Sequence, residues 1–354
     1  MSKQPQVTHE LFASFEEMLS PPALSDILQH KVMRVQCKVS EKISGYSGSE
    51  FYEVMADERP LVVKRMRHLS DWISIVTDDA RCRSVRLWQY GVLDRIRPHM
   101  DHVTLAACHD GEEYALLLED VSYGLVSGRY PSPTDIYSFL DALAALHALY
   151  WEDNELAKPE LALCDAEPFL TFSWPVHTDR YEQDVPQITK GWELLFAMLE
   201  PDAGDGLQSL MDNLEPLQCK LAIYPSSLLH GDYRQANLAF LNASKRVAAL
   251  DWQLASYGPV VLDLAWFLDT SVPPAQITAA GDYYRLRLST QVGEQFDDNE
   301  WHPMFEVARL ADVLRKANWF AYFAVHGGNV EIRALARRSV EGYNETVRAG
   351  LRWL

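Results

Sequence analysis

The sequence predicts a two-lobed α+β fold, with a β-rich lobe over residues 1–120 and a mostly helical lobe over residues 121–354. Between Val32 and Met66, short runs alternate apolar and polar residues, as strands do. After Asp120 the apolar residues instead recur at helical spacing. With 48% apolar residues, the chain can bury the core that such a fold needs. We therefore expect a cleft between the two lobes.

The first lobe is expected to hold two helices and an antiparallel meander. Apolar residues from Leu11 to Leu19 fall at helical spacing, Pro21-Pro22 is expected to end that helix, and a second helix should follow near residues 23–29. A further helix is expected around residues 81–96. The predicted strands cover residues 33–39, 51–55, 61–64, 103–108 and 114–118.

The second lobe combines long helical patterns with one β-hairpin. The polar residues 242–246 separate two apolar runs, which indicates a hairpin over residues 238–252. Helical patterns cover residues 135–151, 191–199, 206–217, 303–326 and 330 to the end.

Charge and cysteine content narrow the possible partners. The net charge of −18 and pI near 5.0 would repel a phosphate backbone, so nucleic acid is not an expected partner. A cationic substrate would be attracted, although acidic charge that only keeps a protein soluble gives the same composition. Five cysteines without close spacing predict neither a disulfide framework nor a zinc site. With no secretory signal or membrane-spanning pattern, a reducing cytoplasm is the expected location.

The chemistry is expected in the stretch from Leu229 to Asn237 and at Asp251. Asn237 and Asp251 are equidistant from Ser244, so in-register pairing of the hairpin would set them opposite each other, with Cβ atoms roughly 5 Å apart. An amide and a carboxylate together suit Mg²⁺. Asp232 precedes the hairpin and is placed to accept the proton of an attacking hydroxyl. This division of roles predicts phosphoryl transfer.

The motifs His230-Gly231-Asp232, Asn237 and Asp251-Trp252-Gln253 together resemble the aminoglycoside phosphotransferase and choline kinase superfamily. Gly258-Pro259 and the Asp-Leu-Ala-Trp-Phe run at 263–267 resemble its ecdysteroid-kinase-like and uncharacterised phosphotransferase branch. The resemblance implies a bilobal protein-kinase-like fold. It also implies an ATP-dependent kinase that transfers the γ-phosphate to a hydroxyl of a metabolite, natural product or antibiotic.

The same resemblance implies roles for single residues. Asp232 is the implied catalytic aspartate, Asn237 and Asp251 are the implied Mg²⁺ ligands, and His230 is expected to brace the catalytic loop. Arg234 is a candidate contact to phosphate or substrate, with a solvated loop arginine as the alternative. Two further residues are expected outside the chemistry: Asp263 as a lock on the loop and His147 as a satisfied core histidine.

Candidate nucleotide contacts lie in the first lobe. Gly45, Ser47 and Gly48 fall between two strand patterns, where backbone N–H groups can approach phosphates, although an ordinary hairpin turn has the same composition. Lys64 ends a strand and is expected to pair with the α- and β-phosphates. Backbone groups near Glu119 and Val121 resemble the family's hinge and are expected to bind adenine.

One feature departs from the family pattern. Kinase-like folds pair the strand lysine with a helix glutamate, and the expected helix, residues 81–88, has no acidic residue. Asp78, Asp79 and Glu50 are the possible substitutes. The departure keeps a non-catalytic nucleotide-binding protein as an alternative.

A metal-dependent hydrolase using the same carboxylates is a second alternative, in which the glycine-containing loop and Lys64 would have no purpose. The acceptor site is expected in the region 151–187, where Trp151, Trp174 and Tyr181 are candidate walls or core residues.

Overall fold

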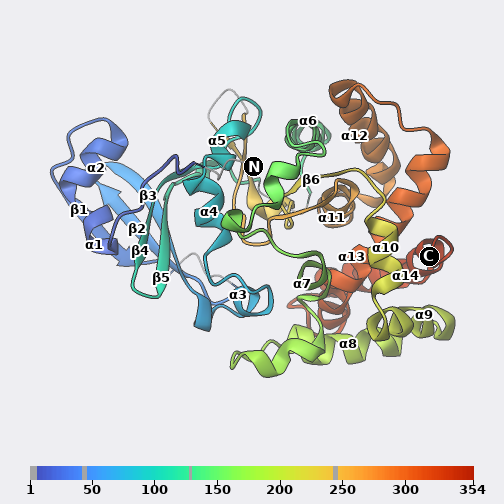
Figure 1. The fold of residues 1–354 in the computed structure, drawn as a ribbon. Helices are drawn as coiled ribbons and strands as arrows, with labels where there is room; N and C mark the ends of the chain where they lie inside the picture. The colour runs from blue at the N-terminus through green and yellow to red at the C-terminus, as the bar shows by residue number, and fades with distance from the viewer. Residues whose placement is uncertain (1–5, 42–45, 127–129, 242–245) are drawn as a thin grey trace.

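The computed structural model describes residues 6–41, 46–126, 130–241 and 246–354. Figure 1 shows an antiparallel sheet on one side of the molecule and the helices from α6 onward on the other. The predicted α+β fold class, with a β-rich first part and a mostly helical remainder, is therefore confirmed. None of the helices within these ranges is both long enough and apolar enough to cross a membrane.

The sheet has the order β1-β2-β3-β5-β4, and every neighbouring pair is antiparallel. Lys64 lies on β3, opposite Phe51 of β2 and Leu116 of β5, so its backbone is held by strands on both sides. The strands are β1 (Val35–Val39), β2 (Glu50–Ala56), β3 (Arg59–Arg67), β4 (Thr104–Asp110) and β5 (Glu113–Glu119).

The helices of the first part differ from the prediction in their bounds, and the helix over Trp72–Val76 was not predicted. The first helix is shorter than expected and ends before the proline pair. Pro21-Pro22 itself begins the second helix, because Ser20 caps it by accepting the Ala23 N–H and proline fits the first turn. The helix expected over 81–96 is two short helices, separated at Gly91, where φ is +68°. The helices are α1 (Phe15–Met18), α2 (Pro21–Leu28), α3 (Trp72–Val76), α4 (Arg83–Gln89) and α5 (Val92–Ile96).

The second part contains the long helices and two small sheets. Helix α11 was not predicted, because nearly all its residues are buried and its sequence lacks an amphipathic period. Its helices are α6 (Pro133–Leu149), α7 (Ala166–Thr171), α8 (Pro186–Met198), α9 (Pro201–Asp212), α10 (Glu215–Leu221), α11 (Val261–Ser271), α12 (Ile277–Val292), α13 (Asp298–His326) and α14 (Val330–Leu351). The strands are β6 (Ser226–Leu229), β7 (Leu238–Leu241), β8 (Arg246–Ala249) and β9 (Ser256–Pro259), with β6 paired to β9 and β7 to β8.

The predicted hairpin register is wrong by one residue. β7 and β8 pair antiparallel with Leu241 opposite Arg246, and the Leu250 N–H donates to the Asn237 carbonyl at 2.8 Å. Asn237 therefore lies opposite Leu250, one residue before Asp251. The cause is that Arg246, counted with the polar turn, belongs to β8. The remaining turn residues, 242–245, lie outside the described ranges.

Two large hydrophobic cores organise the described residues, beside a small third cluster that joins Val103 and Val121 to β7 and β8. The smaller of the two large cores joins α1 and α2 to one face of the sheet. The larger core combines residues of α3, α4 and α5 with the helices of the second part. Helices from the first 120 residues thus share a core with the helical part. We propose residues 1–120 and 121–354 as the two lobes, with α3 to α5 at their junction.

Candidate active site

The loop from His230 to Asn237 connects β6 to β7, and a buried aspartate binds its first two backbone N–H groups. Asp263, at the start of α11, accepts the His230 N–H at 2.7 Å through Oδ2 and the Gly231 N–H at 2.9 Å through Oδ1. Its side chain is fully buried. Both hydrogen bonds fit the expectation that Asp263 locks the loop. His147, buried as expected, has its Nε2 3.4 Å from Asp263 Oδ2.

His230 braces the same loop through both ring nitrogens. Nε2 donates to the Leu250 carbonyl at 2.9 Å, and Nδ1 accepts the Asp232 N–H at 3.2 Å, which defines the neutral tautomer. Burial lowers the pKa of His230 and so favours this neutral form. The His230 side chain is fully buried and does not line the cavity that opens beside Asp232. Its contacts are those of a positioning residue between Asp232 and the strand that precedes Asp251.

Three donors fix the carboxylate of Asp232. Oδ1 accepts from Arg234 Nε at 2.8 Å and from Trp266 Nε1 at 2.9 Å, and Oδ2 accepts from Asn237 Nδ2 at 2.7 Å. A carboxylate has about four acceptor sites, so room remains for one more hydrogen bond. Arg234 was predicted as a phosphate or substrate contact, and in this structure its guanidinium is paired with Asp232. The sequence did not indicate the Trp266 contact.

Lys64 and Asp251 form an ion pair between the sheet and the loop after β8. Their Nζ and Oδ1 atoms are 2.7 Å apart. The Lys64 side chain is 6% exposed, whereas that of Asp251 is 39% exposed and remains accessible. Burial alone would raise the pKa of Asp251, but the Lys64 ammonium outweighs it and lowers the pKa. For Lys64, burial favours the neutral amine, and Asp251 reverses this and raises the pKa.

No substitute proposed for the helix glutamate forms an ion pair with Lys64 within the described part of the chain. Asp78 pairs with Arg180, Glu50 accepts from the Tyr52 hydroxyl, and Asp79 contacts Arg83. Asp71, which the sequence analysis did not single out, lies close enough to raise the pKa of Lys64 electrostatically. In the described residues, the carboxylate in direct contact with Lys64 is that of Asp251.

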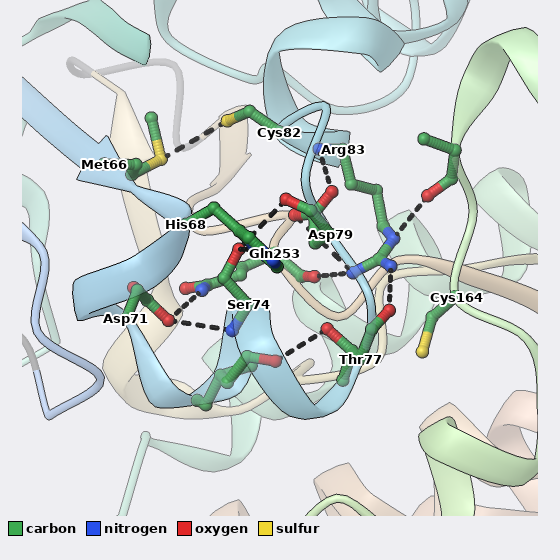
Figure 2. A network of polar contacts seen from close by, with 12 residues as sticks. Met66, His68, Asp71, Ser74, Thr77, Asp79, Cys82, Arg83, Cys164 and Gln253 are labelled. Atoms are coloured by element: carbon green, nitrogen blue, oxygen red, sulfur yellow. Dashed lines mark hydrogen bonds and ion pairs between the residues drawn. The ribbon is translucent and has the colours of Figure 1, made fainter. Parts of the chain in front are cut away.

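Figure 2 shows a network of polar contacts that connects Asp71 and Arg83 to Gln253. The Gln253 side chain donates to Asp71 Oδ1 at 2.7 Å, and its backbone carbonyl accepts from the Arg83 guanidinium. Arg83 also donates to the carbonyls of Ala162 and Thr77, at 2.7 and 3.2 Å. The Asp-Trp-Gln motif is thus fixed from the first 120 residues by a side-chain contact and a backbone contact.

The glycine-containing segment is attached to the same network. Ser47 and Ser49 both donate to Asp71 Oδ2, at 2.6 and 2.9 Å. Gly48 has φ +111°, and a Cβ there would lie 2.2 Å from the Ser70 carbonyl oxygen. Only glycine fits this close approach. Gly45 lies outside the described residues.

The predicted hinge follows β5. The Glu119 N–H donates to the Val103 carbonyl at 2.9 Å, and the Val121 carbonyl accepts the Gly124 N–H at 2.8 Å. The Glu119 N–H is therefore already engaged, whereas the Val121 carbonyl oxygen can accept a second hydrogen bond. Any adenine contact at this hinge would have to use groups other than the Glu119 N–H.

A cavity of about 590 Å³ opens beside Asp232 and Arg234. Aromatic side chains from α3, α11 and α13 form much of its wall. Of the candidate walls named from sequence, none lines it: Trp151 packs on Phe296, Trp174 donates to the Leu314 carbonyl, and Tyr181 packs on Trp72. Phe172, from the same region of the chain, does line it. The expected region thus contributes to the wall through a different residue.

A sequence model of the phosphotransferase enzyme family matches residues 42–298, well over half of the chain. The chain belongs to this family. The match confirms the predicted superfamily, and with it that the protein is a phosphotransferase. No curated protein sequence matches the chain.

Three solved structures show that the phosphotransferase has the fold of this family. A candidate aminoglycoside phosphotransferase from Ralstonia eutropha is 16% identical, with a TM-score of 0.52 over 94% of this chain and 98% of that chain. A microcompartment-associated aminopropanol kinase is 13% identical, with a TM-score of 0.52 over 94% and 99%. The choline kinase LicA from Streptococcus pneumoniae is 14% identical, with a TM-score of 0.50 over 94% and 100%.

Proposed function

We propose that this phosphotransferase transfers the γ-phosphate of ATP to a hydroxyl group of a small molecule, with Mg²⁺ bound by Asn237 and Asp251. The observation that carries this proposal is the position of Asp232. Its carboxylate borders the cavity and is hydrogen-bonded to Asn237, one of the two proposed metal ligands. An acceptor in the cavity and a metal-bound phosphate would then meet at Asp232.

The residues present fit a magnesium ion. Asn237 offers an amide oxygen, while its Nδ2 donates to Asp232, and the exposed part of Asp251 offers a carboxylate. Mg²⁺ prefers a few protein oxygens together with water and phosphate. When bound, the ion neutralises charge on the phosphates. The negative charge of Asp251, preserved by Lys64, suits this role.

Each remaining group has a proposed task in the transfer. The acceptor oxygen forms a bond to the γ-phosphorus while the bond to the leaving ADP oxygen breaks, and the hydroxyl proton passes to Asp232. Lys64 is proposed to bind the phosphates, and backbone groups near Glu119 and Val121 the adenine. Gly45, Ser47 and Gly48 are proposed to cover the phosphates, with the last two positioned through Asp71 and Ser70.

A triphosphate turnover assay separates this function from its alternatives. ATP and Mg²⁺ are incubated with the protein, with and without a library of small alcohols, and released ADP and phosphorylated product are measured. The transferase predicts ADP release that depends on an acceptor and matches product one to one. ADP release independent of any acceptor would indicate a hydrolase. Nucleotide binding without turnover for any alcohol would indicate a non-catalytic binding protein.

A further inference from the structure

We infer that the acceptor is a neutral, ring-bearing alcohol and not a cationic one. This inference rests on the proposed function, because it names the acceptor for the hydroxyl transfer at Asp232. It is carried by the wall of the 590 Å³ cavity, whose shape, charge and aromatic surfaces can each be compared with a possible acceptor.

The wall contains a continuous aromatic cluster. The Trp72 ring lies 6.3 Å from Phe172 and 6.5 Å from Trp319, and both pairs are stacked. Tyr46 meets Trp319 edge-on at 6.2 Å, which extends the cluster to the glycine-containing segment. Such surfaces bury flat hydrocarbon favourably and impose a preference for rings. Aliphatic residues, among them Ile73 and Leu254, continue the wall.

The ionic groups that line the cavity already have partners. Within the described residues, the charged side chains on the wall are those of Asp232, Arg234 and Lys316. Asp232 is paired with Arg234, and the Lys316 ammonium pairs with Asp312 and, at 2.9 Å, with Asp269. The wall therefore offers an ammonium group no carboxylate other than Asp232, which the transfer itself requires. A polycationic acceptor would need several.

The protein's own cations also occupy aromatic faces near the cavity. The Arg315 guanidinium lies 4.4 Å from the Trp266 ring and 3.9 Å from the Phe169 ring, and Lys316 Nζ lies 5.0 Å from Trp266. Arg315 is fully buried, and its Nε and Nη1 have no hydrogen-bond partner in the described ranges. A ligand ammonium would have to approach these positive groups at low dielectric. Trp266 is therefore a poor site for cation–π binding of a substrate.

The volume argues for a molecule with rings. Cavities of this size hold drug-sized ligands, usually on apolar walls with a few polar groups that set orientation. An acceptor of the size of choline would leave most of the aromatic cluster without contact. The net charge of −18 favours cations in solution, but the cavity wall does not share that excess of carboxylates.

The test is a pair of probes that share one ring system. Binding of 2-(2-naphthyl)ethanol and of 2-(2-naphthyl)ethylamine is measured by calorimetry with the full chain in the absence of nucleotide. We expect the alcohol to bind at least about tenfold more tightly than the amine. A tenfold ratio is what the loss of roughly one favourable contact by the amine would produce. Equal or tighter binding of the amine, or no binding of the alcohol at millimolar concentration, would overturn the inference.

Two variants locate the binding. Trp319→Ala removes a half-buried ring from the cluster and should weaken binding of the alcohol about tenfold. Phe305→Ala removes another half-buried ring of the same helix, one that packs on Trp301 and does not line the cavity, and should leave binding unchanged. Alcohol binding that survives Trp319→Ala intact would also contradict the inference. Since nucleotide is absent, failure of ATP binding in a separate titration would affect the proposed function and not this result.

Discussion

Asp232 is held more tightly than its motif indicates. Its three hydrogen bonds come from a loop arginine, a β7-flanking asparagine and the α11 tryptophan Trp266. Because these contacts orient the carboxylate before an acceptor binds, little further conformational freedom would be lost in positioning it. Its carboxylate contacts neither Lys64 nor Asp251, and Asn237 is its one direct contact with the proposed metal ligands.

Asp232→Asn should therefore affect transfer far more than ATP binding. We expect the transfer rate to fall by roughly 10² or more, as for a lost general base, while the ATP dissociation constant stays within a few-fold. Single-turnover kinetics and ATP titration measure the two effects. Asp205→Asn, an exposed aspartate on α9, is the control. Equal loss of rate and ATP affinity would instead make Asp232 a metal ligand.

Sequence reasoning found the residues whose spacing is local. His230, Asp232, Asn237 and Asp251 lie within one stretch of 22 residues. Hydrogen bonds join Asp232 to Asn237 and His230 to the Leu250 carbonyl, next to Asp251. Asp71 escaped notice because its partner Gln253 is 182 residues away in the chain. A lone aspartate before a short helix resembles an ordinary helix cap, and Asp71 does cap α3 by accepting the Ser74 N–H.

At the scale of elements, the hydrogen bonds of the Asp71 carboxylate connect three segments whose relative positions nucleotide binding would require. It fixes the serines flanking Gly48, the start of α3 and the Asp-Trp-Gln turn after β8. Asp251, two residues before Gln253, adopts φ +64°, in the left-handed region. Such a conformation in a non-glycine residue persists only where neighbouring contacts impose it. Gln253 supplies contacts of this kind.

Gln253→Ala should consequently weaken Mg²⁺-dependent ATP binding although Gln253 is not a proposed ligand. Loss of the Asp71 contact leaves a buried carboxylate short of a donor, at a cost of about 1–3 kcal/mol in the free energy of unfolding. We expect the ATP dissociation constant with Mg²⁺ to rise several-fold and the value without Mg²⁺ to change less. Gln208→Ala removes an exposed Gln–Asp hydrogen bond on α9, away from the site, and should change neither dissociation constant. An identical loss with and without Mg²⁺ would argue for a general packing defect.

The elements themselves were predictable where periodicity was strong. All five strands of the sheet were anticipated, and so were the long helices α6, α13 and α14. The prediction did not resolve elements that depend on caps and burial. Ser20 caps a helix that begins at two prolines. Helix α11 has no polar face by which its period could be recognised. Arg246 belongs to a strand although its charge suggests a turn.

At the scale of the whole molecule, the junction between the proposed lobes contains buried charge. Arg83 is 1% exposed and reaches carbonyl groups of both lobes, and its neighbour Asp79 is also buried. Burial raises the pKa of Asp79 from 3.8 to about 6, although Arg83 opposes the shift. Between about pH 4 and pH 6, the Asp79 carboxyl group binds more protons in the folded chain than in the unfolded chain, so its contribution to stability falls as pH rises.

Asp79→Asn should remove that pH dependence. The amide oxygen can still accept the Arg83 backbone N–H, which is 2.7 Å from Asp79 Oδ1. The carboxylate charge no longer has to be buried, although Arg83 loses its ion pair with Asp79. We expect the melting temperature of the variant minus that of the natural sequence to be more positive near pH 7 than near pH 4. The other titrating groups are the same in both proteins, so their effects cancel in this difference. Thermal unfolding at both pH values measures this. A difference that does not vary with pH would show that Asp79 does not titrate in this window.

The proposed nucleotide site can be tested most directly by calorimetric titration with ATP, with and without Mg²⁺, on the natural sequence and on Asp251→Asn. We predict that Mg²⁺ strengthens ATP binding about tenfold or more, and that Asp251→Asn abolishes this gain because the amide cannot neutralise a metal–phosphate unit. Absence of ATP binding at millimolar nucleotide, or a Mg²⁺ effect that Asp251→Asn leaves intact, would contradict the assignment of the site.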